Sequence, residues 1–121
     1  MLEPLRLCRY DEIEDPGSRG FHFGDPYQGA KFFIVRRDKE IWAYENSCPH
    51  TGAPMDWQPG QVLSLDKSLI QCALHFAQFR FEDGLCLHGP CRGQNLVPVA
   101  IERRGDEIWL TDAVMLERAA N

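Results

Sequence analysis

Two short cysteine–histidine segments constrain this chain more than any other feature of its sequence. They are Cys48–His50, with the pattern Cys-x-His, and Cys72–His75, with the pattern Cys-x-x-His. Each segment places one thiol and one imidazole within reach of a single loop. If the fold brings the two loops face to face, their four side chains supply the ligands of one metal centre. A fold that presents the two loops opposite each other would allow such a centre to form.

Two kinds of metal centre accept two cysteines and two histidines. A closed zinc site binds all four side chains to one tetrahedral ion. A two-iron cluster places both cysteines on one iron and both histidines on the other. The ligand chemistry alone leaves this choice open.

Composition and charge indicate a single globular domain. The chain has 121 residues, of which 44% are hydrophobic and 26% charged, so we expect one domain over residues 1–121. The formal net charge of −5 argues against nucleic acid as a partner and is compatible with docking to a basic protein surface. No segment has the apolar length of a signal peptide or a membrane span, which predicts a soluble, cytoplasmic protein without a membrane partner.

The spacing of apolar residues and turn signals predicts an all-β fold. We expect strands or hairpin arms at residues 5–9, 31–36, 41–45, 69–72, 79–85, 96–101 and 108–110. The glycine- and proline-rich segment 14–29 is expected to be a loop, and Asp112 is expected to cap a short C-terminal helix. Short strands at close spacing are typical of an antiparallel sandwich or barrel.

Three cysteines, Cys8, Cys86 and Cys91, lie outside the two segments. An odd total of five cysteines without a secretion signal indicates metal ligation plus free thiols rather than a disulfide framework. Cys8 is interpreted as a small buried strand residue. Cys86 and Cys91 are interpreted as two thiols on a turn, with a disulfide or a second metal site as alternatives.

The paired motifs resemble those of the Rieske [2Fe–2S] family, in which Cys-x-His is followed after a gap by Cys-x-x-His. The similarity covers residues 31 to 110 and includes Pro49 and Gly52 in the first loop and the Asp83-Gly84 turn beyond the second. It implies a Rieske-type antiparallel β-sandwich or barrel with a small cluster-binding subdomain of two loops, at about residues 46–60 and 70–91. It also implies iron rather than zinc.

The resemblance implies that Cys48, His50, Cys72 and His75 bind one [2Fe–2S] cluster. The cysteines would bind the inner iron, and the histidines would bind the outer iron near the surface. The implied function is one-electron transfer by a Rieske-type ferredoxin, with a reductase as donor and an oxygenase or another reductase as acceptor. It assigns no catalytic residue, so we expect an electron-transfer component of an oxidoreductase system rather than a catalyst.

Three residues after the second pair depart from the family pattern. Phe76 stands where the family usually has glycine. Ala77 and Phe79 stand where high-potential members have a serine and a tyrosine that donate hydrogen bonds at the cluster. Because hydrogen bonds to sulfur stabilise the reduced cluster, their absence predicts a low potential, about −150 mV.

Other functions remain open at this point. One is a Rieske-like small subunit of a larger redox enzyme, similar to that of assimilatory nitrite reductase. Another is a zinc-stapled interaction module, and a further one is a redox or iron sensor that uses Cys86 and Cys91. The sequence shows no Ser-His-Asp signature, phosphate loop or dinucleotide fingerprint.

Overall fold

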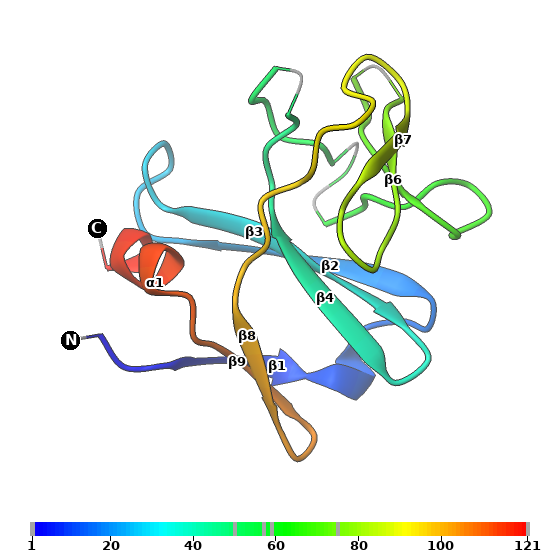
Figure 1. The fold of residues 1–121 in the computed structure, drawn as a ribbon. Helices are drawn as coiled ribbons and strands as arrows, with labels where there is room; N and C mark the ends of the chain where they lie inside the picture. Colours follow the sequence, from blue (N-terminus) through cyan, green and yellow to red (C-terminus); the bar gives the residue numbers. More distant parts are fainter. Residues whose placement is uncertain (1, 50, 57, 59, 75, 121) are drawn as a thin grey trace.

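The structure is a computed structural model that describes residues 2–49, 51–56, 58, 60–74 and 76–120. Within these residues the fold consists of short antiparallel strands in three sheets, with one 3₁₀-helix and one short α-helix (Figure 1). The expected all-β class with a short C-terminal helix is confirmed.

The strands are β1 (Leu5–Arg9), β2 (Gly17–Phe23), β3 (Ala30–Arg37), β4 (Glu40–Glu45), β5 (Ile70–Gln71), β6 (Gln78–Phe79), β7 (Cys86–His88), β8 (Ile101–Arg104) and β9 (Glu107–Leu110). The helices are η1 (Tyr10–Glu12) and α1 (Ala113–Ala119). The sheets have the strand orders β1-β9-β8, β2-β3-β4 and β5-β6-β7.

Strand β3 is the centre of the molecule because both of its faces are buried. Successive side chains of a strand point to opposite faces, so the apolar run from Phe32 to Val35 serves two cores. The base core holds one set: Cys8, Ile13, Ala30, Phe32, Ile34, Ala43, Val99, Ile108, Leu110, Met115 and Leu116. The loop core holds the other: Phe33, Val35, Tyr44, Cys48, Met55, Val62, Ile70, Cys72, Ala77, Phe79, Phe81, Cys86, Cys91 and Leu96.

Segment 14–29 contains strand β2, so the prediction that it is a loop is wrong. β2 pairs with β3 along its whole length, from Gly17 opposite Arg36 to Phe23 opposite Ala30. A Cβ atom on Gly20 would lie 2.9 Å from the Cα of Gly60. Glycine at position 20 therefore allows another segment to approach the strand closely, and does not mark a loop.

Turn chemistry predicted the hairpins and the helix cap correctly. β3 and β4 form a hairpin whose turn has Asp38 at a φ of 59°, although it lacks glycine. β6 and β7 pair around the Asp83-Gly84 turn. Asp112 accepts a hydrogen bond from the backbone N–H of Met115 and so caps α1.

The last strand pair is shorter than the sequence predicted. β8 begins at Ile101. Residues 96–99, which we expected to belong to the same strand, instead contact β4 and the turn before β7. The N–H of Val99 donates to the carbonyl of Ala43, and that of Leu96 donates to the carbonyl of Gly84. This segment therefore links the two cores and does not extend the sheet of β8.

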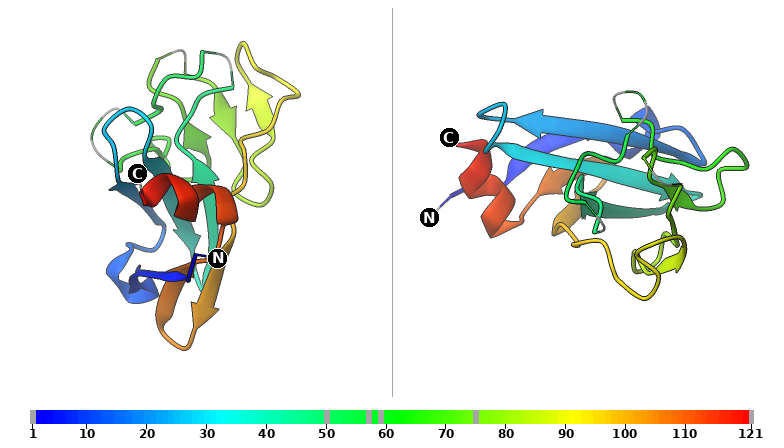
Figure 2. Two further views of the ribbon diagram at one scale, coloured as in Figure 1. Left: turned by 90° about the vertical axis from the view of Figure 1, so that its left-hand side faces the viewer. Right: turned by 90° about the horizontal axis from the view of Figure 1, so that it is seen from above.

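Helix α1 packs against β2 and β3 at the end of the molecule away from the short sheet of β5, β6 and β7 (Figure 2). It buries Met115 and Leu116 in the base core. Within the described part of the chain, no helix has the length and apolarity needed to cross a membrane.

Candidate metal centre

The first predicted ligand, Cys48, lies in a tight turn shortly after β4. The N–H groups of Thr51 and Gly52 donate to the Cys48 carbonyl at 3.2 and 2.6 Å, and the Cys48 N–H donates to the Ala53 carbonyl at 2.9 Å. Gly52 has a φ of 77°, which a side chain would make costly. The turn closes on itself and leaves the Cys48 side chain buried in the loop core.

The second predicted ligand, Cys72, follows β5 directly and lies in a similar turn. Its N–H donates to the Ala77 carbonyl at 2.9 Å, and its carbonyl accepts from the Phe76 N–H at 3.0 Å. Cys72 and Ala77 are fully buried in the loop core. The two turns thus present one buried cysteine each to the same apolar interior.

Phe76 has the backbone conformation that glycine would have at this position, with a φ of 56°. Phe76 therefore has a left-handed backbone conformation, which glycine adopts at lower cost. Phe76 is 67% exposed, so it adds apolar surface at the second turn.

A backbone hydrogen bond joins the two turns. The N–H of Ala73 donates to the carbonyl of Met55 at 2.9 Å, and Met55 is fully buried in the loop core with Cys48 and Cys72. The fold therefore brings the two predicted cysteine ligands onto adjoining loops (Figure 1). The predicted ligands His50 and His75 lie outside the described residues, and among the described residues no cluster of three or more His, Cys, Asp or Glu side chains is suited to a metal ion.

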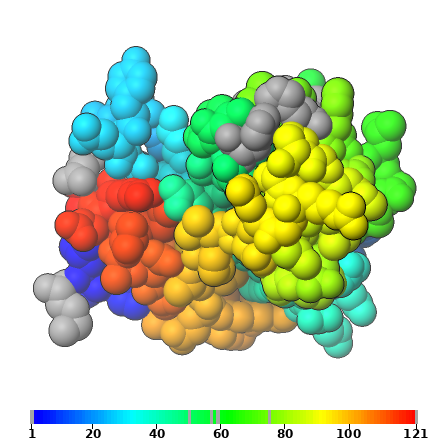
Figure 3. Space-filling model, turned by 45° about the horizontal axis from the view of Figure 1, so that its top comes forward, coloured from blue at the N-terminus to red at the C-terminus, as the bar shows by residue number. Residues whose placement is uncertain are grey.

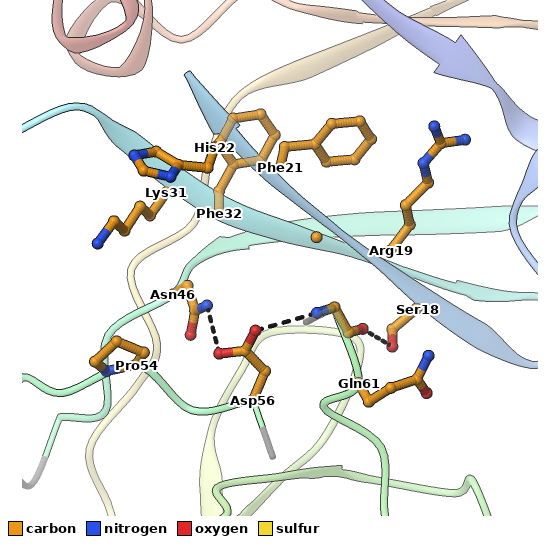
Figure 4. A pocket seen from close by; sticks show the side chains of 12 residues that line it. Ser18, Arg19, Phe21, His22, Lys31, Phe32, Asn46, Pro54, Asp56 and Gln61 are labelled. Atoms are coloured by element: carbon orange, nitrogen blue, oxygen red, sulfur yellow. Dashed lines mark hydrogen bonds between the residues drawn. The ribbon is translucent and has the colours of Figure 1, made fainter. Parts of the chain in front are cut away.

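A polar network at the base of the first loop went unnoticed in the sequence (Figure 4). Asn46 accepts from the Met55 N–H at 2.7 Å and donates to Asp56 at 3.1 Å. Asp56 accepts from the Gly60 N–H at 3.1 Å, and Ser18 of β2 donates to the Gly60 carbonyl at 2.6 Å. We call Asn46, Asp56, Gly60 and Ser18 the first-loop clamp, because together they fix both ends of the loop that carries Cys48.

The interior behind the two turns is apolar. Ala77 and Phe79 are fully buried, so neither position brings a side-chain hydrogen-bond donor to the loop core. The Tyr44 hydroxyl donates to the Phe81 carbonyl. Burial raises the pKa of Tyr44 to about 12, which keeps the hydroxyl protonated.

The other three cysteines are also buried. Cys8 is buried in the base core on β1. Cys86 and Cys91 lie at the start of β7 and in the turn after it, and both are buried in the loop core. No disulfide joins any of the five cysteines, all of which are among the described residues.

Residues 4–104 match the family model of the Rieske [2Fe–2S] domain. The match covers most of the chain, and the chain therefore belongs to the Rieske [2Fe–2S] family. Its cofactor is one Rieske-type [2Fe–2S] cluster, which decides between the iron and zinc alternatives. The two buried thiols on adjoining loops fit the cysteine half of the ligand set of such a cluster.

Solved structures show the same fold. One is a complex of reduced oxygenase and oxidised ferredoxin in carbazole 1,9a-dioxygenase, with a TM-score of 0.68 and 20% identity over 88% of this chain and 91% of that one. Another is the ferredoxin of carbazole 1,9a-dioxygenase from Nocardioides aromaticivorans IC177, with a TM-score of 0.67 and 22% identity over 90% of this chain and 97% of that one. No curated protein sequence matches the chain.

Proposed function

We propose that this chain is a Rieske-type ferredoxin that carries one electron at a time to an oxygenase. Its cluster ligands would be Cys48, His50, Cys72 and His75, within a single domain over residues 1–121 and on loops at about 46–60 and 70–91. The observation that carries the proposal is the burial of Cys48 and Cys72 on two loops joined through Ala73 and Met55, in a chain that matches the Rieske family.

Solved structures of carbazole dioxygenase systems support an oxygenase as the electron acceptor. The chain covers 91% and 97% of two proteins of carbazole dioxygenase systems. It covers only 28% of the chain matched in another oxygenase–ferredoxin complex, where a Rieske-like fold is part of a longer polypeptide. We therefore propose an oxygenase as the electron acceptor and a reductase as the electron donor. The oxygenase would determine which compound is oxidised.

In this function the cluster supplies the one-electron chemistry and the chain supplies its surroundings. The two turns hold Cys48 and Cys72 in the loop core, where water is excluded. Ala77 and Phe79 bring no donor from their side chains, which supports a potential near the low end of the Rieske range, about −150 mV. Apolar side chains of Leu74 and Phe76, 50% and 67% exposed, lie on either side of position 75 in the sequence and offer a contact surface for a redox partner.

The same exposed side chains make a permanent subunit of a larger redox enzyme the second candidate. Apolar residues at an obligate interface stay covered, whereas a transient carrier exposes them between encounters. Purification from the native host, followed by light scattering, separates the two. A chain that elutes alone supports the carrier, and a fixed complex supports the subunit.

The experiment that tests the proposed function is electron paramagnetic resonance of the dithionite-reduced protein, with iron and zinc counted on the same sample. We expect the low average g value of the Rieske family and about two irons per chain. A silent spectrum with one zinc per chain would overturn the electron-carrier proposal. Reduced protein should then pass its electron to a partner oxygenase in a stopped-flow assay.

A further inference from the structure

Cys86 and Cys91 form a second sulfur site in the loop core. Each residue is only 2% exposed, and the two Sγ atoms are 3.2 Å apart. The thiol of Cys91 donates to the sulfur of Cys86, and the thiol of Cys86 donates to the His88 carbonyl. The two sulfur atoms would need to approach by only about 1 Å to reach the length of a disulfide bond.

Backbone hydrogen bonds hold the two thiols at this separation. The Cys86 N–H donates to the Gln94 carbonyl at 2.8 Å, and the Gly93 N–H donates to the Cys86 carbonyl at 3.1 Å. The Gln94 N–H donates to the Cys91 carbonyl at 2.9 Å. Backbone hydrogen bonds therefore already hold Cys86 and Cys91 in one closed turn. A disulfide between them does not require a rearrangement of the backbone.

This turn lies at the surface and packs against the second metal-binding loop. Gly89 has a φ of 107°, and a Cβ atom there would lie 2.8 Å from the Cα of Ala77. Residues 88–90 and 92–95 are exposed on either side of Cys91 (Figure 3, yellow). The buried thiols are therefore flanked by surface residues on this turn.

We propose that Cys86 and Cys91 are a dithiol site that a peroxide oxidises reversibly to an intrachain disulfide. The Cys86 sulfur attacks one peroxide oxygen and breaks the O–O bond, giving a sulfenic acid and water when the oxidant is hydrogen peroxide. The Cys91 sulfur then attacks the Cys86 sulfur, forms the S–S bond and releases a second water. The thiols lose two electrons and two protons, and the peroxide gains them.

The hydrogen bonds assign the order of the two steps. A hydrogen bond to a sulfur atom stabilises its thiolate, and Cys86 accepts one from Cys91, which would stabilise the thiolate once the Cys86 proton, now donated to the His88 carbonyl, has left. Cys86 therefore attacks the peroxide, and Cys91 resolves the sulfenic acid. The reaction uses none of the four predicted cluster ligands.

The sequence permits a direct test on the holoprotein. Trypsin cuts after Arg80 and Arg92, so one peptide, residues 81–92, contains Cys86 and Cys91 and no other cysteine. The protein is treated with hydrogen peroxide, denatured in iodoacetamide and digested, while iron content and visible absorbance are followed on the same sample. Reduction by dithiothreitol before alkylation provides the reverse reaction.

We expect this peptide to become lighter by two hydrogen atoms, to resist alkylation, and to take up two alkyl groups after reduction. Iron content should not change while this happens. A peptide that takes up two alkyl groups after peroxide treatment would overturn the proposal. So would a bond between either thiol and Cys48 or Cys72, or a disulfide that appears only after the iron has been lost.

Variants test the order of the steps. In Cys91→Ser, oxidised glutathione should leave glutathione attached to Cys86, because the resolving thiol is missing. In Cys86→Ser, Cys91 should remain unmodified for at least tenfold longer under the same conditions. Cys8→Ser, which changes a thiol of the base core, should form the Cys86–Cys91 disulfide at the wild-type rate. Trapping on Cys91 instead of Cys86 would overturn the assigned order.

Discussion

The two cores of this protein are built by different means. The base core lies between sheets whose strands pair over long stretches, such as β2 with β3 from Gly17 to Phe23. The loop core is enclosed by β5 and β6, of two residues each, and β7, of three. Sheet ladders hold the first region, whereas turns, a polar clamp and the proposed ligands hold the second.

This difference shows how a stable scaffold presents an irregular site. We expect the base core to be the more cooperative part of the fold, because its backbone hydrogen bonds lie in the ladders of two three-stranded sheets. The loop core has few ladder bonds, so its stability depends on individual groups and on the cofactor. Both regions share the buried strand β3, and the site is therefore fixed to the scaffold through Phe33 and Val35.

Removing a proposed ligand should produce the largest difference between the loop core and the base core. Cys72→Ala deletes a thiolate that we assign to the inner iron, and we expect the purified variant to contain almost no iron. Amide hydrogen exchange should quicken in residues 46–56 and 70–91 and remain slow in β1, β3 and β9. Cys8→Ala, a matched change in the base core, should keep its iron, and retention of iron by Cys72→Ala would contradict the ligand assignment.

Neighbouring phenylalanines on β3 allow a matched comparison of the two cores. Phe32 and Phe33 are both fully buried, one in each core. Phe32→Ala and Phe33→Ala should each lower the free energy of unfolding by about 3–5 kcal/mol, through lost burial and the cavity left behind. Only Phe33→Ala should also release iron faster under native conditions, as followed with a chelator. Equal release rates in the two variants would show that the cores are not separate.

The first-loop clamp should have a smaller effect that is confined to the loop core. Asn46→Ala removes the acceptor of the buried Met55 N–H and the donor to Asp56. We expect a loss of about 1–3 kcal/mol in the free energy of unfolding and a faster release of iron. Asn95→Ala, which removes an exposed hydrogen bond to the Asp83 carbonyl, is the control and should change neither quantity much. An Asn46 variant that matches this control would rule out the clamp.

The smallest expected effect concerns the hydroxyl of Tyr44. Tyr44→Phe removes its hydrogen bond to Phe81 and should lower the free energy of unfolding by about 1 kcal/mol at neutral pH. In the wild type, burial raises the Tyr44 pKa to about 12, above the unfolded value near 10. The stability that this shift contributes is complete below pH 10 and is lost as the pH rises through 12.

Urea unfolding at several pH values measures this contribution. The decline in stability between pH 10 and 12 should be shallower in Tyr44→Phe than in the wild type. Tyr27→Phe is the control, because Tyr27 is 93% exposed, and its profile should follow the wild type. An unchanged alkaline slope in Tyr44→Phe would contradict the assigned pKa.

Much of the local structure was predictable from the sequence, because its causes are local. The Asp83-Gly84 turn and the Asp112 cap depend on residues within a few positions of each other, and both were identified. The strand β2 was missed because glycine is normally a loop signal, and here position 20 faces Gly60 from a distant segment. The clamp was also missed because it joins distant segments: Ser18 and Gly60 are 42 positions apart.

The sequence by itself determined the types of the four proposed ligands, their spacing, and the apolar run that forms β3. These depend on residue identity and on the alternation of side chains along a strand. Tertiary structure alone decided that Ala73 and Met55 join the two loops and that the Cys86 and Cys91 thiols meet. Such contacts arise from the packing of distant segments against one another, and no local pattern in a single sequence encodes which segments will meet.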